Sequence, residues 1–507
     1  MNVIKQDAYF WKVAYTLVIK QPYRVISLQT NELWLADDSR KKVIRLVRAD
    51  FDWSNQLKTN MEMAFAKLDG LRTQLRWKTI EAETIYVAVL PPVDDWEHLV
   101  KRKKNHPNGK VQMNSYLIEQ ATEGYKITPD QMPLDLPNEH EVKGEEEYEK
   151  DISYYKHAVR ASVEKKQNQE KQTFSRGKPI VSYIMLTAVI LMYIWLEYAG
   201  GSTNTLNLIQ WGAKYNPLII EGEWWRLFSA MFLHIGFFHL MMNGLALYFL
   251  GTLVERIFGS IRFFFIYMIA GLIGSLASFA FMGAVSAGAS GAIFGCFGAL
   301  LYFGLIHREL FFRTMGQNVI VILVINLVFG FVVQGIDMGA HLGGLAGGFL
   351  AAALVKLPSQ KGFWIRYAAG IGVVIVASTL WIVGNQFPSN HAQTDLQIAA
   401  EYIDQGNLDD AVPYLERAHV SEEELPEVPF YLAYIYLNQN QNTEAIPLLE
   451  EAMRIRPEFH EAIYNLALAY ALEGNTDEAK TLIEEAISIE PDEQMYLDLQ
   501  SQIEESS

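Results

Sequence analysis

The chain has 507 residues, half of them apolar, with 42 Lys and Arg against 58 Asp and Glu and a single Cys. This length exceeds one ordinary domain, and one cysteine provides neither a disulfide framework nor a cysteine-based zinc site. The excess acid lies in the tail, where residues 385–507 hold 26 Asp and Glu against 4 Lys and Arg. With no concentrated basic stripe anywhere, nucleic acid is excluded as the partner.

Residues 1–160 predict a soluble α/β domain. Short β-branched runs at 13–19, 43–47 and 84–89, expected as strands, alternate with a helix-like stretch at 53–76. Residues 161–178 are a charged linker. The apolar run near the N-terminus is short and contains a lysine, so no cleavable signal peptide is expected. The first transmembrane helix then directs the chain to the membrane.

Two aspartates, Asp50 and Asp52, follow the second β-branched run of this domain. If the strand continues that far, both carboxylates lie on one face. Oxygen ligands suit Mg²⁺ or Mn²⁺, so one hypothesis is a divalent-cation site on the N-terminal domain. Solvated loop carboxylates are the more ordinary alternative.

Apolar segments that are long enough to cross a bilayer follow the linker. We expect seven spans, at residues 179–198, 228–250, 262–282, 290–306, 318–336, 339–356 and 364–385. Lys and Arg precede the first span and lie after the second, fourth and sixth, whereas the alternate loops contain only Lys214 and Arg226. The positive-inside rule then predicts a multi-pass protein of the cell membrane, with a cytoplasmic N-terminal domain and an extracytoplasmic tail.

Polar side chains are costly inside a bilayer, so their positions in the spans indicate function. The second span carries His234, His239 and Asn243, of which the last two share one helical face. The fourth begins GASGAIFG, which places Ser290 at a helix start, and the sixth begins AHLGG with His341. Together they predict nucleophilic catalysis: a base accepts the serine proton and fixed donors hold the oxyanion.

Small residues accompany both polar groups, Gly291 with Gly295 and Gly343 with Gly347. They allow two helix backbones to approach until a short serine side chain reaches a histidine on another helix. Each motif alone is more often structural, because Gly-x-x-x-Gly also packs helices that have no active site. A zinc protease would need a His-Glu-x-x-His helix, and an aspartyl protease would need two intramembrane aspartates. Neither pattern occurs in the sequence.

The tail repeats with a period of 34 residues. Tyr402, Tyr436 and Tyr470 recur at this interval, as do two series of alanines. The pattern resembles the tetratricopeptide repeat, a solenoid of paired helices. That resemblance implies an all-α domain over residues 386–507 that binds proteins or peptides in a concave groove. An acidic spacer or assembly surface is the alternative.

The runs WWRLFSAMFLH, HLMMN, LVERIFGS, GASGAIFG and AHLGG are similar in order and spacing to the rhomboid proteases, over about 200 residues. The resemblance implies an intramembrane serine protease in which Ser290 attacks the scissile peptide bond and His341 is the general base. It also implies that His239, Asn243 and the Ser290 backbone N–H form the oxyanion hole. No cofactor is required for catalysis, and the substrates are transmembrane proteins in the lipid bilayer, cleaved near its external face.

The same resemblance gives supporting places to His234, Gly288, Gly291, Phe294, Trp225, Arg226, Glu255 and Arg256. Trp225 and Arg226 belong to the first external loop, and Glu255 with Arg256 forms a structural pair at the cytoplasmic end of the second span. Phe294 stands where many members have a tyrosine, and it keeps the ring that packs under the histidine. No aspartate completes a triad, so this packing is expected to orient His341.

The whole layout, a soluble domain, seven spans and a repeat tail, resembles the large bacterial rhomboids. We therefore expect an active protease whose two soluble domains recruit or select clients. The alternative from another class is a membrane adaptor that presents membrane-protein clients to other factors. Ser290 and His341 favour the enzyme, since an adaptor needs neither group. A transporter is disfavoured because the spans hold no further charged relay.

Overall fold

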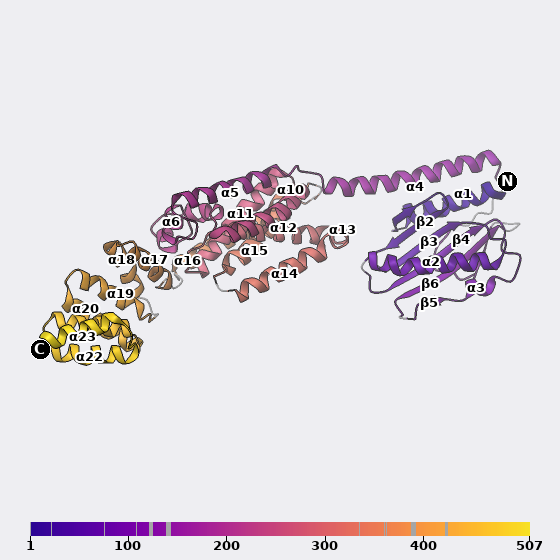
Figure 1. Ribbon diagram of the computed structural model, residues 1–507. Helices are drawn as coiled ribbons and strands as arrows, with labels where there is room; N and C mark the ends of the chain where they lie inside the picture. The colour runs from indigo at the N-terminus through magenta and orange to yellow at the C-terminus, as the bar shows by residue number, and fades with distance from the viewer. Residues whose placement is uncertain are drawn as a thin grey trace. The chain divides into compact units, whose positions relative to one another are not determined.

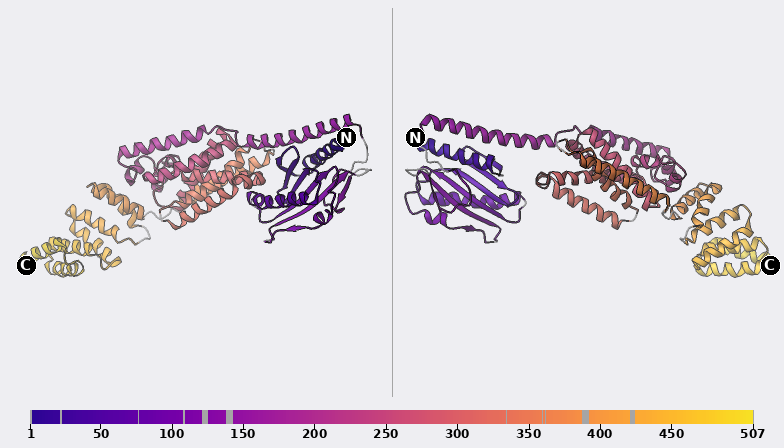
Figure 2. Two further views of the ribbon diagram at one scale, coloured as in Figure 1. Left: turned by 45° about the vertical axis from the view of Figure 1, so that its right-hand side comes forward. Right: turned by 180° about the vertical axis from the view of Figure 1, so that it is seen from behind.

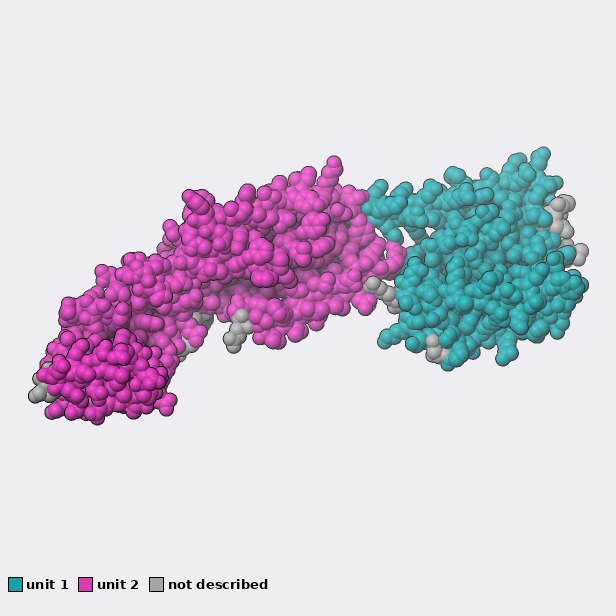
Figure 3. All heavy atoms as spheres, in the orientation of Figure 1, with its two compact units in different colours: residues 1–173 teal, residues 174–507 magenta. Residues whose placement is uncertain are grey.

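The computed structural model describes residues 2–21, 23–75, 77–107, 109–120, 125–137, 143–333, 335–358, 360, 362–386, 392–420 and 424–506. The chain divides into two compact units, residues 1–173 and 174–507 (Figure 3). The first unit contains a β-sheet, and the second is helical.

The described part of the N-terminal unit forms a seven-stranded mixed sheet in the order β1-β2-β3-β4-β6-β5, with β7 paired to β6. The β3–β4 and β4–β6 pairs are parallel, and the other pairs are antiparallel. The strands are β1 (Arg24–Leu28), β2 (Glu32–Asp37), β3 (Lys42–Arg48), β4 (Ile80–Ala88), β5 (Lys104–Asn105), β6 (Val111–Gln120) and β7 (Tyr125–Thr128). The helices are α1 (Asn2–Tyr15), η1 (Thr16–Lys20), α2 (Ser54–Gln74), α3 (Glu97–Lys101) and α4 (Glu145–Thr173).

An apolar core lies on each face of this sheet, because side chains of a strand alternate between the faces. Val43 and Val47 of β3 belong to the core that contains α2, whereas Ile44 and Leu46 belong to the core that contains α1 (Figure 1). Helices therefore cover both faces.

Of the elements predicted for this unit, the runs at 43–47 and 84–89 lie in or at the end of β3 and β4, and the helix predicted at 53–76 is α2. Residue 76 lies outside the described residues. The strand predicted at 13–19 is wrong, because α1 continues there into the π-helical turn η1. Phe10, Val13, Ala14 and Leu17 are fully buried, a helical spacing that outweighs the β-propensity of the run.

Apolar helices fill residues 180–386 of the second unit. Among the described residues, five runs are long and apolar enough to cross a membrane: Ile180–Ala199, Gly236–Phe258, Ser260–Phe281, Met338–Val355 and Trp364–Gln386. Helix α13 (Arg308–Thr314) and α14 (Gly316–Val332) meet the same test only as a pair, bent by 74°, and α12 (Ser290–Ile306) is shorter. Each of the seven predicted spans thus overlaps a helix, and five of these helices have the length of a full span.

This region contains further helices, several of which are labelled in Figure 1. They are α5 (Ile180–Ala199), α6 (Thr205–Gln210), α7 (Asn216–Ile220), α8 (Arg226–Ser229), η2 (Ala230–Phe232), α9 (Gly236–Ala246), η3 (Leu247–Gly251), α10 (Thr252–Phe258), α11 (Ser260–Phe281), α15 (Met338–Val355) and α16 (Trp364–Gln386).

The second span does not begin at residue 228 as predicted. Residues 226–232 form the short helices α8 and η2, and the long helix begins at Gly236 and runs to Phe258. Gly236 has a φ of 77°, a left-handed conformation that breaks the helical path and favours glycine. His234 consequently lies in the turn before the helix, while His239 and Asn243 lie within it.

The tail is a stack of antiparallel helices (Figure 2). They are α17 (Ala392–Asp404), α18 (Leu408–His419), α19 (Glu427–Asn438), α20 (Asn442–Ile455), α21 (His460–Leu472), α22 (Thr476–Ile489) and α23 (Gln494–Ser506). Ala411, Ala445 and Ala479 are fully buried, and they occupy equivalent positions in α18, α20 and α22. The 34-residue repeat predicted from the sequence is therefore confirmed.

Candidate active site

Ser290 is the first residue of α12, directly after the loop of residues 282–289. Within this loop, Gly288 lies against the ring of His239 from α9. A Cβ atom added at Gly288 would lie 2.8 Å from His239 Cε1 and 3.0 Å from Nε2, so a side chain would displace the ring. Glycine at this position therefore lets the imidazole of His239 reach the backbone that leads into Ser290.

His341 lies on the first turn of α15 and is buried, with 9% of its surface exposed. Its ring stacks on Phe294 of α12, with centroids 4.1 Å apart and planes 13° apart. Phe294 is one turn after Ser290 on the same helix face. A Cβ added at Gly330 of α14 would lie 3.6 Å from His341 Nδ1. Among the described residues Nδ1 has no hydrogen-bond partner.

Helices α12 and α15 pack with their backbones in contact. A Cβ added at Gly344 would lie 1.9 Å from the carbonyl oxygen of Gly291, and one at Gly348 would lie 2.1 Å from that of Gly295. Only glycine fits at such positions. The contact holds the helix of Ser290 against the helix of His341.

The glycines of α15 that make this contact are not the predicted ones. Gly343 and Gly347 face α11, where added Cβ atoms would lie 2.9 Å from the carbonyl oxygen and from Cβ of Ile273, respectively. Helix α15 packs between α11 and α12, so it carries one row of small residues for each neighbour. The sequence shows both rows but not which row faces which helix.

Two histidines at the start of the second span lie beside the loop before Ser290. The rings of His234 and His239 meet edge to face, with centroids 5.3 Å apart. His234 is fully buried, and its Nε2 accepts a hydrogen bond from the Ala289 N–H at 3.4 Å. Asn243 donates through Nδ2 to the carbonyl oxygen of His239 at 3.1 Å. His234 thus contacts the residue directly before Ser290.

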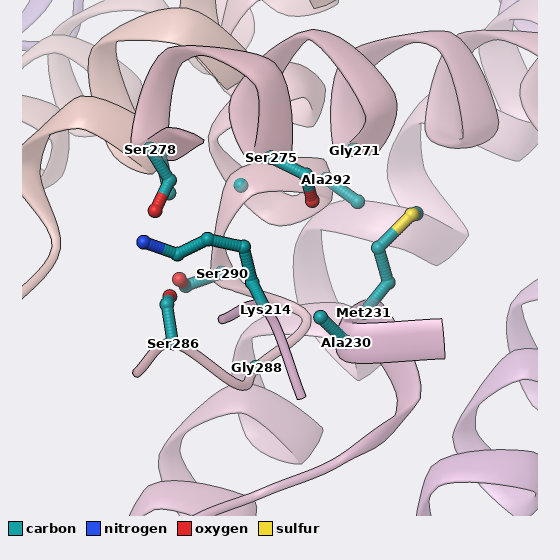
Figure 4. Close-up of a pocket in the computed structure, with 12 residues that line it drawn as sticks. Lys214, Ala230, Met231, Gly271, Ser275, Ser278, Ser286, Gly288, Ser290 and Ala292 are labelled. Carbon is teal, nitrogen blue, oxygen red and sulfur yellow. The ribbon is translucent and has the colours of Figure 1, made fainter. Parts of the chain in front are cut away.

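A small polar cavity opens next to Ser290, with Lys214, Ser275, Ser278 and Ser286 in its wall. Figure 4 shows the Lys214 side chain extending past Ser290 toward Ser278. Lys214 is fully buried, and its backbone N–H and carbonyl pair with Ser286 at 2.9 and 3.0 Å. It was not selected as a site residue from the sequence. The available signal was an isolated lysine in a loop that is otherwise poor in basic residues.

The burial of Lys214 is expected to make the stability of the protein depend on pH. Burial lowers the pKa of Lys214 from 10.5 to about 8, and the Asp337 carboxylate opposes this effect. Because the unfolded chain binds more protons between the two values, this group makes the free energy of unfolding rise with pH there. From about pH 7 to about pH 9.5, wild type should gain about 1–2 kcal/mol over Lys214→Met in detergent unfolding experiments. A difference that does not change with pH would contradict this prediction.

Arg226 fastens the loop between α5 and α9. It is 4% exposed, and its guanidinium lies 4.8 Å from the centre of the Trp225 ring. Nη1 donates to the carbonyl oxygens of Ile209 at 2.5 Å and Ala213 at 3.2 Å. Arg226, beside the Trp225 ring, therefore holds the turn after α6.

The structure shows Glu255 in contact with the start of α5, where the sequence predicted a pair of Glu255 with Arg256. Glu255 is fully buried and accepts hydrogen bonds from the backbone N–H groups of Val181 at 3.0 Å and Ser182 at 2.8 Å. It satisfies the free donors at the start of α5, where a negative charge is also favourable. Arg256 is exposed.

The aspartates of the N-terminal unit do not share a strand face, because β3 ends at Arg48. Asp50 Oδ1 accepts hydrogen bonds from the Val89 N–H at 2.6 Å and from Gln6 Nε2 at 3.2 Å. Within the described ranges, no group of three or more His, Cys, Asp or Glu side chains is placed to hold a metal ion. The divalent cation at Asp50 and Asp52 remains a prediction without a ligand set.

Known proteins resemble this chain in its helical core and in its tail. The Rhomboid domain matches residues 221–357, and Tetratricopeptide repeat families match residues 396–452 and 437–503. Rhomboid protease GluP of Bacillus subtilis (strain 168) is 38% identical over 418 residues, which cover 80% of each chain. Putative rhomboid protease YdcA of the same strain is 35% identical over 192 residues, 38% of this chain and 95% of that protein. RHOMBOID-like protein 1 of Arabidopsis thaliana is 38% identical over 165 residues, 32% of this chain and 42% of that protein.

The Rhomboid domain match includes the helices that carry His239, Ser290 and His341. The match to the GluP protease extends far beyond that domain, across four fifths of both proteins. Identity at this level and over this length reflects a shared fold and a shared chemistry. The chain belongs to the rhomboid family and is an intramembrane serine protease with a tetratricopeptide repeat tail.

Proposed function

We propose that this protease hydrolyses peptide bonds of transmembrane substrates with a dyad of Ser290 and His341. The observation that carries the proposal is the stacking of His341 on Phe294, 4.1 Å apart and one helical turn from Ser290. A serine needs a neighbouring base to become nucleophilic, and a base without an aspartate needs another group to hold its ring. Phe294 supplies that support.

In this mechanism Ser290 Oγ attacks the carbonyl carbon of the scissile bond, and its proton passes to His341. Because Nδ1 faces Gly330 on α14, Nε2 is the nitrogen that accepts the proton. The carbonyl oxygen becomes an oxyanion, held by the Ser290 N–H with His239 and Asn243. The C–N bond then breaks, His341 protonates the leaving amine, and water hydrolyses the acyl-enzyme with His341 as the base.

The topology proposed for the chain is seven crossings with the tail outside. The loop between α5 and α9 contacts α17 of the tail, where Glu401 accepts hydrogen bonds from the N–H groups of Thr205 and Leu206. The two therefore lie on one side of the membrane, which requires an even number of crossings between them. Seven spans satisfy this requirement, as five would, and six do not. The basic residues before α5 place the N-terminal domain, residues 1–160, in the cytoplasm, joined by the linker 161–178.

In this arrangement cleavage takes place near the external face, on the side of Ser290 and the loop before it. The N-terminal domain and the tail at 386–507 recruit or select clients on opposite sides of the membrane. Tetratricopeptide solenoids present concave surfaces that suit protein or peptide partners. The same surfaces would serve a membrane adaptor, the function to which we would turn if hydrolysis were absent.

Cleavage of a single-span reporter by the purified full-length protein in liposomes tests the proposal. Ser290→Ala should lower the rate by at least about 10⁴-fold. Ser275→Ala removes another hydroxyl from the same cavity and should cleave like wild type. Equal product from wild type and Ser290→Ala would remove Ser290 as the nucleophile and favour the adaptor.

A further inference from the structure

The first helix of the repeat tail, α17, packs on the loop between α5 and α9, and Figure 1 shows it near α6. Ile398 of α17 is fully buried in an apolar cluster with Ile209 and Tyr215 from the loop between α5 and α9. Val285 packs against the same cluster. Val285 belongs to the loop 282–289, so the cluster that contains Ile398 of the tail also includes a residue of the segment that leads to Ser290.

An ionic cluster around the buried carboxylate of Asp395 stabilises this contact. Asp395 of α17 is 2% exposed, and its carboxylate accepts hydrogen bonds from the Tyr215 hydroxyl and from Arg417 of α18. Arg417 approaches both carboxylate oxygens, at 3.1 and 3.2 Å, and also donates to the Tyr215 hydroxyl at 2.8 Å. Removing Arg417 leaves the buried Asp395 carboxylate without its cationic partner, which is more disruptive than losing an exposed ion pair.

The same helix fixes the beginning of α6. The Glu401 carboxylate accepts hydrogen bonds from the backbone N–H groups of Thr205 at 3.3 Å and Leu206 at 3.1 Å. Gln397 donates through Nε2 to Thr205 Oγ1 at 3.0 Å. Helix α17 therefore holds the loop between α5 and α9 at two places, the start of α6 and Tyr215.

From Tyr215 a short chain of contacts leads to the nucleophile. The preceding residue, Lys214, pairs through its backbone with Ser286 in both directions, four residues before Ser290. Its Nζ donates to the carbonyl oxygen of Met282 at 2.7 Å. Lys214 thus holds the loop 282–289 at two places, at Met282 through its side chain and at Ser286 through its backbone. Lys214 is adjacent to Tyr215, the residue that the tail holds.

We propose that Asp395 and Arg417 are positioning residues for peptide-bond hydrolysis. Through Tyr215 and Lys214 they hold the loop 282–289 in the conformation from which Ser290 attacks. This inference rests on the proposed role of Ser290. It makes the helices α17 and α18 a part of the catalytic apparatus, although the rest of the solenoid remains free to bind partners.

Two arginines of the tail form a matched pair for the test. Arg417 lies 4.8 Å from the Tyr414 ring centre and pairs with Asp395, while Arg456 lies 4.8 Å from the Phe459 ring centre and pairs with Glu427. Of these two arginines, only Arg417 also bonds to a residue outside the solenoid in the part of the chain that the structure describes. In reporter cleavage by the full-length protein, Arg417→Gln should lower kcat about tenfold and change KM less than about twofold. Arg456→Gln should leave both constants unchanged.

Hydrogen–deuterium exchange separates positioning from a general loss of stability. Backbone amides of residues 282–289 should exchange faster in Arg417→Gln than in wild type or Arg456→Gln, while those of α20 to α22 should not change. The same difference is expected in a Ser290→Ala background, so this readout does not depend on the nucleophile. Wild-type kcat, or reduced kcat with unchanged exchange in the loop, would overturn the proposal.

Tyr215→Phe provides the second variant, because it removes only the hydroxyl and leaves the tail's own residues intact. It should lower kcat in the same direction, and the double variant with Arg417→Gln should be no slower than Arg417→Gln alone, since both break one cluster. If Arg417→Gln does not fold, the test is the kcat of Tyr215→Phe alone. A Tyr215→Phe protein with the kcat of wild type would overturn the proposal. Cleavage by Ser290→Ala at the wild-type rate would instead refute the proposed nucleophile.

Discussion

The double variant Ser290→Ala with His341→Ala is expected to cleave a reporter no more slowly than either single variant. Each single replacement should lower kcat by at least about 10⁴-fold, because the hydroxyl without its base, or the base without its hydroxyl, contributes nothing to attack. The residual rate should be the same in all three. Measured kcat values in liposomes check this, and losses that add in the double variant would contradict a dyad.

His307 provides the control for the histidine. It lies at the other end of α12, directly after Ile306. His307→Ala should retain wild-type kcat, because the helix between Ser290 and His307 is about 26 Å long at 1.5 Å per residue. A loss equal to that of His341→Ala would mean that the effect of histidine replacement comes from the stability of α12 and not from proton transfer.

Gly344→Ala is expected to destabilise the core and abolish activity. The new methyl group would lie 1.9 Å from the carbonyl oxygen of Gly291, so α12 and α15 would have to separate. Overpacking of this kind costs about 1–3 kcal/mol or more, since both contacting atoms belong to backbone. Separation would also move His341 away from Ser290. Thermal unfolding in detergent, together with reporter cleavage, measures both effects.

Gly372→Ala is the matched control in another apolar helix. A Cβ there would lie 3.5 Å from Leu350 Cδ2, an ordinary contact with a side chain that can move. Since alanine favours a helix over glycine by up to about 1 kcal/mol, this variant should be as stable as wild type or slightly more stable. A Gly344→Ala protein with the same behaviour would show that α12 and α15 are not in backbone contact.

The features that could be predicted from the sequence were those that repeat along the chain or depend on neighbouring residues. Apolar runs located the helices of the core, and the 34-residue period located buried alanines such as Ala411 and Ala445. The errors occurred where tertiary packing decides. The run at 13–19 became helical because one face is buried against the sheet, and the row of α15 glycines that meets α12 is one residue away from the row predicted.

Contacts between distant segments left no local trace in the sequence. Tyr215 and Asp395 are 180 residues apart, and neither has a partner that spacing or composition could identify. Lys214 was visible as an isolated charge in a loop, but its burial beside Ser290 depends on the path of the loop 282–289. A single sequence predicts the periodicity of a helix or repeat well, but it does not show which distant segment the end of that element contacts.

The length of α12 sets the depth of the reaction. Its 17 residues span about 26 Å at 1.5 Å per residue, less than the roughly 30 Å of a bilayer's hydrocarbon layer. If its far end lies at the opposite surface, Ser290 sits a few ångströms below the water. If Ser290 is the nucleophile, as proposed, a transmembrane substrate would have to unwind locally and bring its peptide bond to the serine. Sequences that bear helix-breaking residues just inside the outer leaflet would be the ones most easily cut.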